Sequence, residues 1–299
     1  MHYLCTTKCF RRTLWAVPEA EILGLWHGAI EHLKNMKKFV TLGASLLLLT
    51  ACAQKSAQDS PAPTPTTLTW IEDKPEPTLQ PLSLYPNVPD SLWKALGLEE
   101  GIPSSISCLL LQTDGKDILI DAGLGAPFSQ LMPKLKELGI SPETLSLIYI
   151  SHLHPDHIGG LLKDGQKAFP KAEVYVNRIE AEAWRAMEGE QSALAKRVLE
   201  VYKDRLHLFE AGDTLEGCVK TIAAYGHTPG HTLFEKDSLL VISDLIHGAA
   251  LQLKHPEYGP QYDMNPEAAK VSRIRILEYA RQHNLTMYGM HLPQPGFVK

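Results

Sequence analysis

Runs of apolar residues divide this 299-residue chain into short segments separated by turns. Brief apolar runs bounded by turn residues are typical of buried strands, whereas apolar positions at helical spacing predict helices. The runs predict strands at 106–112, 117–121, 145–150, 172–176, 219–223, 231–234, 239–243 and 285–290, with short ones at 208 and 214–215. The helical spacing predicts helices at 129–138, 178–187, 192–206 and 266–283.

The order of these elements predicts a mixed α/β layered fold. Hairpin turns at 114–115 and 235–238 join neighbouring strands, and helices separate several of the later strands. The sequence contains neither a G-x-G-x-x-G nor a G-x-x-x-x-G-K-[ST] phosphate loop, and it contains no G-x-S-x-G nucleophile elbow. Nucleotide-binding and serine-hydrolase classes are therefore unsupported.

The densest group of potential metal ligands, in the stretch S-H-L-H-P-D-H, directly follows the strand predicted at 145–150. It lies at a strand's C-terminal end, where α/β sheets usually place their sites. His152 and His154 are two residues apart, so in an extended segment they point the same way and can bind one ion together. Asp156 and His157 point elsewhere, which suits a second ion. Imidazole and carboxylate suit zinc and its first-row neighbours; the alternative is a histidine-rich surface loop.

Three further candidate ligands each follow a predicted strand. They are His227 in the stretch G-H-T-P-G-H, Asp244 after the strand at 239–243, and His291 after the strand at 285–290. Each alone is a weak signal, because a lone histidine near a Gly-Pro turn is usually structural. Strand ends that meet at one edge of a sheet would bring all three to the histidine-rich loop, and the combination favours a two-metal site.

The whole pattern, H-x-H-x-D-H followed by G-H-T-P-G-H, S-D and a last His, resembles the metallo-β-lactamase superfamily from about residue 84 to the C-terminus. The resemblance implies an α/β fold, a four-layer αββα sandwich, as a single domain at 82–299. It also implies a role for each ligand position: a first metal on His152, His154 and His227, a second on Asp156, His157 and His291, and a bridging Asp244. Asp121 and His231 are expected to support these ligands from outside.

A bridging carboxylate at Asp244 resembles the lactonase, glyoxalase II and phosphotriesterase-type branches, and zinc β-lactamases lack it. The stretch at 244–252 and the later H-L-P-Q-P-G, at 291–296, resemble the methyl parathion hydrolase-like subfamily, with Gln294 where that group usually has Phe. Such sequences normally continue with another strand pair, so a C-terminal truncation is expected. His247, Leu251 and Tyr262 are expected to line the pocket, with a structural role as the alternative for His247.

The resemblance implies a hydrolase that uses two divalent ions, in the first place zinc, with manganese, cobalt or iron as alternatives. Two ions activate a bridging water to hydroxide near neutral pH. Asp156 is the expected catalytic residue, which orients this nucleophile or moves its proton. The expected substrate is a small ester, lactone or phosphotriester. Two alternatives remain: an iron-dependent persulfide dioxygenase on the same scaffold, and a non-enzymatic metal-binding lipoprotein.

Charge and length limit the partners. The net charge is −5, spread along the chain, and no basic block indicates nucleic-acid binding. The length suffices for one large domain or two small ones. A small-molecule substrate, a membrane reached only through a lipid anchor, and a second copy of the chain in a homodimer are the expected partners.

The N-terminal third predicts export. Residues 36–51 have two lysines, an apolar run too short to span a bilayer and a small-residue end, as in a signal peptide. The stretch L-T-A-C resembles a bacterial lipobox, which implies lipidation of Cys52; Ala53 then favours a periplasmic, outer-membrane-anchored protein. The alternatives are a plain secretory signal and a cytoplasmic protein with an N-terminal core helix. Residues 1–35 are expected to be a non-native upstream extension.

Residues 52–81 are rich in Pro, Ala, Ser and Thr, and this composition predicts a disordered tether between the lipid and the folded body. Cys108 and Cys218 lie in or beside strand-like runs, away from any metal-ligand spacing. They are predicted to be buried free thiols, with a disulfide in an oxidising periplasm as the alternative.

Overall fold

The computed structural model describes residues 65–76 and 78–299. The predicted upstream extension, the signal peptide and Cys52 lie outside the described residues. Among the described helices, none combines the length and apolar character needed to cross a membrane.

One six-stranded sheet has the order β1-β4-β5-β6-β9-β10. Its strands are β1 (Thr67–Glu72), β4 (Ser107–Thr113), β5 (Lys116–Ile120), β6 (Leu147–Ile150), β9 (Glu173–Asn177) and β10 (Leu206–Phe209). The first three pair antiparallel, and β5, β6, β9 and β10 run parallel. The C-terminal ends of β5 and β6 therefore lie side by side.

A second six-stranded sheet has the order β11-β12-β13-β14-β15-β16. Its strands are β11 (Thr214–Leu215), β12 (Val219–Ala223), β13 (Thr232–Lys236), β14 (Leu239–Val241), β15 (Thr286–Tyr288) and β16 (Phe297–Val298). Strand β13 is antiparallel to both β12 and β14, and β14 is parallel to β15. Strands β12, β14 and β15 thus run in one direction and end at the same edge.

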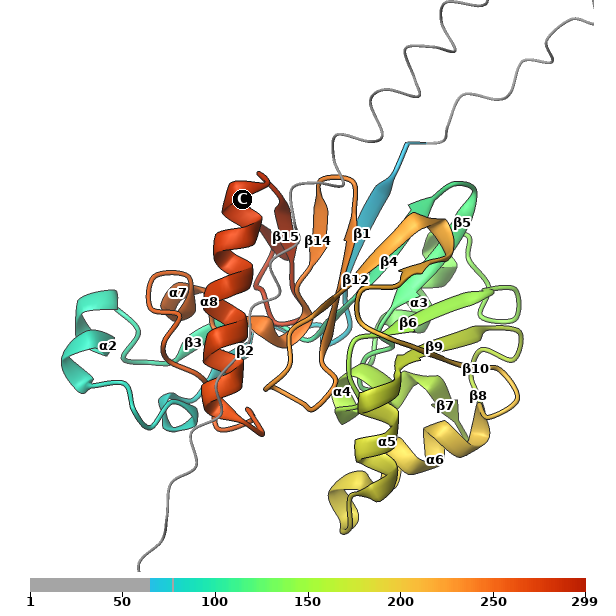
Figure 1. Cartoon of the computed structure of the whole chain (residues 1–299), viewed down its shortest axis with the longest axis horizontal. Coiled ribbons are helices and arrows are strands. Elements are labelled where there is room, and N and C mark those ends of the chain that lie inside the picture. The colour runs from blue at the N-terminus through green and yellow to red at the C-terminus, as the bar shows by residue number, and fades with distance from the viewer. Residues whose placement is uncertain (1–64, 77) are drawn as a thin grey trace, which may run out of the picture. The chain divides into compact units, whose positions relative to one another are not determined.

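The two sheets pack face to face and carry helices on their outer faces (Figure 1). Strand β4 shows how the sequence achieves this: Leu109 and Leu111 face the second sheet, while Cys108 and Leu110 face the helical layer. Helices α3 (Leu131–Glu137), α5 (Arg178–Ala186) and α6 (Ala193–Val201) cover the first sheet, and α8 (Pro266–Gln282) covers the second. This arrangement confirms the predicted four-layer αββα sandwich.

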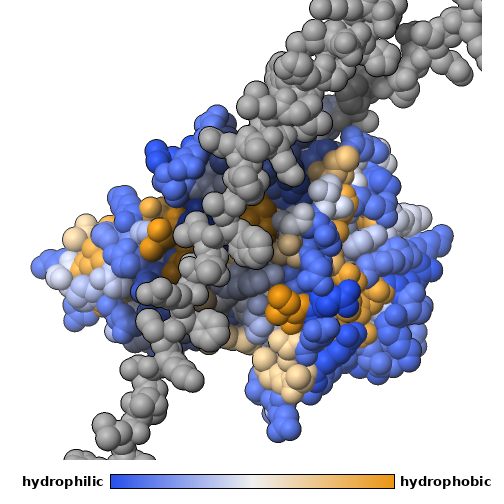
Figure 2. Space-filling view, in the orientation of Figure 1, coloured by the Kyte–Doolittle hydropathy of each residue, from blue (hydrophilic) through white to orange (hydrophobic). Residues whose placement is uncertain are grey.

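A small satellite core forms beside the sandwich around α2 (Asp90–Leu96), β3 (Ile102–Ser104) and α7 (Ala249–Gln252). The other short elements are β2 (Thr78–Gln80), η2 (Leu82–Leu84), α4 (Pro155–Ile158), η3 (Gly159–Leu161), β7 (Leu162–Lys163), β8 (Gln166–Lys167), η4 (Glu190–Ser192), η5 (Glu216–Cys218) and η6 (Ser243–Leu245). Leu251 packs inside the satellite core with no exposed surface, so its predicted place in the pocket is wrong. The visible surface is mostly hydrophilic, with smaller hydrophobic patches (Figure 2).

The predicted tether at 52–81 is wrong over its last part. Strand β1 pairs with β4 along its whole length, from Thr67 opposite Gln112 to Glu72 opposite Ser107, and β2 pairs with β3. Ile71 is buried in the core between the first sheet and its helices. The proline-rich composition of the neighbouring residues concealed this short strand. The folded domain therefore begins before residue 82.

Two smaller predictions also fail. The helix predicted at 192–206 ends at Val201, and a turn closed by the backbone of Tyr202 and Arg205 leads into β10. Helical apolar spacing continued across this turn by coincidence. Both described cysteines are free, but Cys218 is exposed and only Cys108 is buried.

Candidate metal centre

The parallel strand ends bring all seven predicted ligand positions to one edge, between the two sheets. His152, His154, Asp156 and His157 follow β6 of the first sheet. The second sheet supplies the other three, since His227, Asp244 and His291 follow β12, β14 and β15. The site is therefore built half from each sheet, as the strand-end argument predicted.

The first cluster consists of His152, His154 and His227. Their facing ring nitrogens are Nε2, Nδ1 and Nε2, and they lie 2.9–3.2 Å from one another. Zinc–nitrogen bonds of about 2.0–2.1 Å in a tetrahedron place ligand atoms roughly 3.3–3.4 Å apart. The three nitrogens are thus close to the spacing that one such ion requires.

The second cluster consists of Asp156, His157 and His291, and it is wider. Oδ2 of Asp156 lies 3.8 Å from Nε2 of His157 and 3.5 Å from Nε2 of His291. These three side chains form a second group of potential ligand atoms within metal-binding range of one another.

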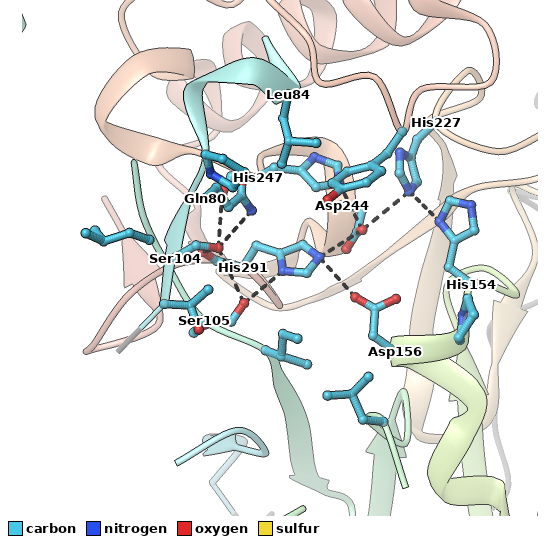
Figure 3. Close-up of a pocket in the computed structure, with 17 residues that line it drawn as sticks. Gln80, Leu84, Ser104, Ser105, His154, Asp156, His227, Asp244, His247 and His291 are labelled. Atoms are coloured by element: carbon cyan, nitrogen blue, oxygen red, sulfur yellow. Dashed lines mark hydrogen bonds and ion pairs between the residues drawn. The ribbon is translucent and has the colours of Figure 1, made fainter. Parts of the chain in front are cut away.

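Asp244 lies between the clusters. Its Oδ1 is 3.1 Å from Nε2 of His157, and its Oδ2 is 3.3 Å from Nε2 of His227 and 3.1 Å from Nε2 of His291. Figure 3 shows Asp244, His227 and His291 pointing toward one another, as a carboxylate shared by two ions would require.

Two buried atoms test whether a metal fits. Among the described residues, neither Nε2 of His157 nor Oδ1 of Asp244 has a hydrogen-bond partner, although they lie 3.1 Å apart. Buried polar atoms nearly always have a hydrogen-bond partner, and a buried atom without one calls for a water or an ion. The donor set, imidazole nitrogens with carboxylate oxygens, is that of zinc and related divalent ions. The residues present therefore fit such ions.

The outer nitrogens of the second-cluster histidines are fixed by hydrogen bonds. Nδ1 of His157 lies 2.8 Å from Oδ2 of Asp121, and Nδ1 of His291 lies 2.8 Å from the carbonyl oxygen of Ser105. Asp121 also accepts hydrogen bonds from the backbone N–H and hydroxyl of Ser151. Partners of this kind orient metal-binding imidazoles, and Asp121 lies where the sequence predicted a supporting carboxylate.

The first cluster has its own carboxylate support, which the sequence analysis missed. Nδ1 of His227 lies 3.0 Å from Oδ1 of Asp263, and Oδ2 of Asp263 pairs with Arg273 at 3.0 Å. Arg273 is buried and also donates to the carbonyl of Leu245, next to Asp244. Asp263 is 36 residues from His227 in sequence and has no motif spacing, so no local pattern indicated this role.

His231 lies behind the first cluster rather than in it. Its ring packs edge-on against that of His152, with centroids 5.2 Å apart, and its Nδ1 contacts the carbonyl oxygen of Ala224 at 3.1 Å. This placement agrees with a supporting position rather than a ligand position.

The pKa values of the candidate ligand histidines shift in opposite directions, because burial and nearby carboxylates act on them to different extents. Burial holds the pKa of His152 well below its ordinary value and lowers that of His154 to about 3. Burial also opposes protonation of His157, but the carboxylates of Asp244 and Asp156 outweigh it and raise its pKa well above the ordinary value. The pKa of Asp244 is well below its ordinary value, because the surrounding histidines outweigh the effect of burial. The site thus holds an ionised carboxylate at its centre.

The site opens into a cavity of about 430 Å³. Apolar side chains supply much of the wall, among them Leu79, Leu84, Ile106 and Leu124, and Tyr262 lies at the exposed side. Among the described residues that line it, there is no lysine and no arginine. The cavity is in the usual size range for small-molecule sites, and it offers no fixed positive side chain to an anion.

His247 also borders this cavity and is buried. Its ring stacks on that of His291, with centroids 5.0 Å apart, and its Nε2 lies 3.1 Å from Oδ2 of Asp244. Both ring nitrogens are without a hydrogen-bond partner among the described residues. The structure therefore places His247 at the cavity, in agreement with the prediction that it lines the pocket.

A sequence profile of the metallo-β-lactamase superfamily matches residues 101–291. The chain belongs to this superfamily. Residues 65–100, which include β1, β2 and α2, precede the matched region. The relatives that the chain matches include hydrolases, among them N-acyl homoserine lactonases.

Relatives with long matches are lactonases and a hydrolase. The chain is 30% identical over 212 residues to the N-acyl homoserine lactonase of Bacillus thuringiensis, covering 62% of this chain and 80% of that protein. It is similar to the structure of AidC, a dizinc quorum-quenching lactonase in complex with a product N-hexnoyl-L-homoserine, at 26% identity and a TM-score of 0.69, covering 78% and 91%. It is also similar to hydrolase AbOPH in the beta lactamase superfamily, at 28% identity and a TM-score of 0.68, covering 78% and 89%.

Other matches are short. Similarity to the anti-Pycsar protein Apyc1 of Saccharibacillus brassicae reaches 43% identity, but only over 56 residues, 19% of this chain and 21% of that protein. The chain spans only about a fifth to a third of the length of the first curated relatives that it matches. These short matches support membership of the superfamily but do not indicate a particular substrate.

Proposed function

We propose that this chain is a binuclear metal-dependent hydrolase of uncharged esters, lactones or phosphotriesters. One observation carries the proposal: Asp244 lies within 3.1–3.3 Å of histidine nitrogens from both clusters, beside an apolar cavity whose described lining contains no lysine or arginine. The lactonase relatives with long matches support the same substrate range.

In this proposal His152, His154 and His227 hold the first ion, and Asp156, His157 and His291 hold the second. Asp244 contacts both. Zinc suits the donor set best, and manganese, cobalt and iron are the alternatives. When bound, such a pair of ions supplies Lewis acidity and lowers the pKa of water from about 15.7 to about 7.

Asp156 has the position of a residue that orients the attacking water. Its side chain is 24% exposed, the most open of the candidate ligands in the second cluster, and it borders the cavity. Burial raises the pKa of this carboxyl, but His157 and His291 outweigh that effect and lower it. A carboxylate with a low pKa is a weak proton acceptor, so Asp156 serves better to accept a hydrogen bond than to remove a proton.

The cavity wall favours an uncharged substrate. Sites that bind phosphate groups or other anions commonly use arginine or lysine side chains. Apolar groups from β2, η2 and the loop after β5 line the wall instead, and they exclude water from the substrate once it is bound.

A substrate panel tests this proposal. The metal-loaded chain is expected to hydrolyse lactones, carboxylic esters or phosphotriesters, and to hydrolyse anionic phosphodiesters much more slowly. Asp156→Asn should lower kcat by more than about tenfold, while exposed Asp164→Asn serves as the matched control. Preference for phosphodiesters would contradict the proposal, as would an Asp156→Asn enzyme with full kcat.

We also propose, from sequence alone, that Cys52 is lipidated and anchors the domain to the periplasmic face of the outer membrane. Incorporation of a labelled fatty acid into the full chain, and its loss in Cys52→Ala, are the expected results. Labelling that survives the substitution would contradict this proposal.

A further inference from the structure

Glu180 is a buried carboxylate that the proposed chemistry does not use. It lies in the first turn of α5, and its side chain is fully shielded from solvent. A buried carboxylate normally needs paired or hydrogen-bonded neighbours. The four partners of Glu180 are all uncharged, and three of them belong to the two chain segments that carry the first cluster.

Each carboxylate oxygen of Glu180 takes two hydrogen bonds. Oε1 accepts from the backbone N–H of Leu153 at 3.0 Å and from the indole N–H of Trp184 at 2.6 Å. Oε2 accepts from the hydroxyl of Thr228 at 2.8 Å and from the backbone N–H of Gly230 at 2.7 Å. Backbone and indole N–H groups can only donate, so both oxygens must act as acceptors.

These partners flank the first-cluster ligands. Leu153 stands between His152 and His154, and Thr228 directly follows His227. Glu180 therefore ties the loop after β6 to the loop after β12, although α5 contributes no candidate ligand of its own.

Close packing makes this tie rigid. A Cβ added at Gly230 would lie 2.4 Å from the backbone nitrogen of Glu180 and 2.7 Å from its Cβ. Only glycine lets the loop after β12 approach α5 this closely. The carboxylate can then reach the N–H of Gly230 directly.

The indole of Trp184 extends the same support to a ligand ring. His154 lies edge-on against Trp184, with ring centroids 5.6 Å apart and an angle of 89° between the planes. His152 and His227 are oriented through Nδ1 by Ser151 and Asp263. For His154, the edge-on contact with Trp184 supplies this orientation instead, and Glu180 fixes the Trp184 indole by accepting its N–H.

We propose that Glu180 is a positioning residue for the first metal ion, which fixes the spacing of His152, His154 and His227 by joining the two loops that carry them. The proposal rests on the proposed binuclear site. Because the four hydrogen bonds of Glu180 go to none of the candidate ligand side chains, its effect must pass through backbone position and through Trp184.

Glu180→Gln tests this role with little change in shape. The amide nitrogen must replace one oxygen and then faces at least one group that can only donate. With the full chain loaded with cadmium, we expect two cadmium NMR resonances, assigned with His154→Ala and His157→Ala. In Glu180→Gln, a chelator should remove the first-cluster ion at roughly 10–100-fold lower concentration, which is the usual effect of losing an outer partner. The second-cluster resonance should remain.

Controls separate positioning from general stability. Glu182→Gln, on the exposed side of the same helix, should retain both ions as the unmodified chain does. Trp184→Phe keeps an aromatic ring but removes one hydrogen-bond donor to Glu180. It should weaken binding of the first-cluster ion by a smaller factor than Glu180→Gln does. It also provides a milder variant if Glu180→Gln does not fold.

Three outcomes overturn the inference. Equal retention of the first ion in Glu180→Gln and the unmodified chain would make Glu180 only a structural residue. Glu180 would also be only a structural residue if Glu180→Gln and Trp184→Phe each weakened the binding of both ions to the same extent. If the unmodified chain bound no cadmium, this result would contradict the proposed binuclear site and therefore also the role of Glu180 that rests on it.

Discussion

The two clusters differ in the spacing of their ligand atoms, although each contributes two side chains to the cavity lining. Ring nitrogens of the first cluster lie 2.9–3.2 Å apart, against 3.5–3.8 Å between Asp156 and its two partners in the second. Burial does not separate them, because each has two buried members and one partly exposed member, His154 in the first and Asp156 in the second. The difference in spacing predicts that the first cluster holds its ion more tightly than the second.

Support from outside follows the same division. The first cluster is held by two buried carboxylates, Asp263 and Glu180, from elements that supply no ligand. In the second cluster, Asp121 fixes His157, a backbone carbonyl fixes His291, and Asp156 extends into the cavity. The wider second cluster is therefore expected to hold its ion less firmly.

The largest expected effect removes the residue shared by both clusters. Asp244→Ala should lower kcat/KM by more than about 100-fold, since losing a direct ligand should exceed the 10–100-fold cost of losing an outer partner. Metal content should fall at the same time, because Asp244 approaches ligand atoms of both clusters. An Asp244→Ala enzyme that keeps both its metal and its activity would mean that the two clusters do not share this carboxylate.

Metal removal should reveal the two clusters as separate steps. Ligands that bind only the folded state at about 100 times their Kd stabilise it by about 2.7 kcal/mol. For a domain of this size, that corresponds to a loss of roughly 5–11 °C in Tm. Calorimetry along a chelator series should show loss of the second-cluster ion first, and most of the decrease in Tm with the first-cluster ion. A single step would contradict the difference between the clusters.

Asp263→Asn and Asp121→Asn should each weaken one ion. The two carboxylates fix His227 and His157 respectively, and the expected loss of affinity is about 10–100-fold for the ion concerned. Asp263→Asn should also lower stability more, because it leaves the buried Arg273 without a charged partner. Competition with a chelator measures the affinities, and exposed Asp164→Asn is the control. Loss of the same ion in both variants would contradict the separate supports.

The smallest expected effect concerns the cavity wall. Leu79 and Tyr262 border the cavity and are each about half exposed. Leu79→Ala should raise KM a fewfold by removing apolar contact of about 1–3 kcal/mol at most, with metal content unchanged. A change in metal content after this substitution would link the wall to the metal clusters, which the structure keeps apart.

Local spacing explains why the convergence of these seven side chains was predictable from sequence. The H-x-H-x-D-H loop and the strand ends before His227, Asp244 and His291 are readable along the chain, and parallel strands bring them to one edge. Helix 266–283 and the strand at 219–223 were also predicted to within a residue. Their apolar patterns are long or clearly bounded.

Tertiary contacts explain what the sequence concealed. Asp263 and Glu180 have no motif spacing, and their roles arise only when distant loops pack against them. Strand β1 was hidden because prolines dominate the composition around it, although Ile71 belongs to the core. Leu251 was predicted to line the cavity, but the short helix α7 turns it into the satellite core.

The most direct measurement is the metal content of the full chain by mass spectrometry, made beside the ester, lactone and phosphotriester panel. About two zinc, manganese or cobalt ions per chain, together with hydrolysis that a chelator abolishes, are expected for a binuclear hydrolase. One iron per chain with oxygen consumption and no hydrolysis would contradict it and favour the dioxygenase alternative.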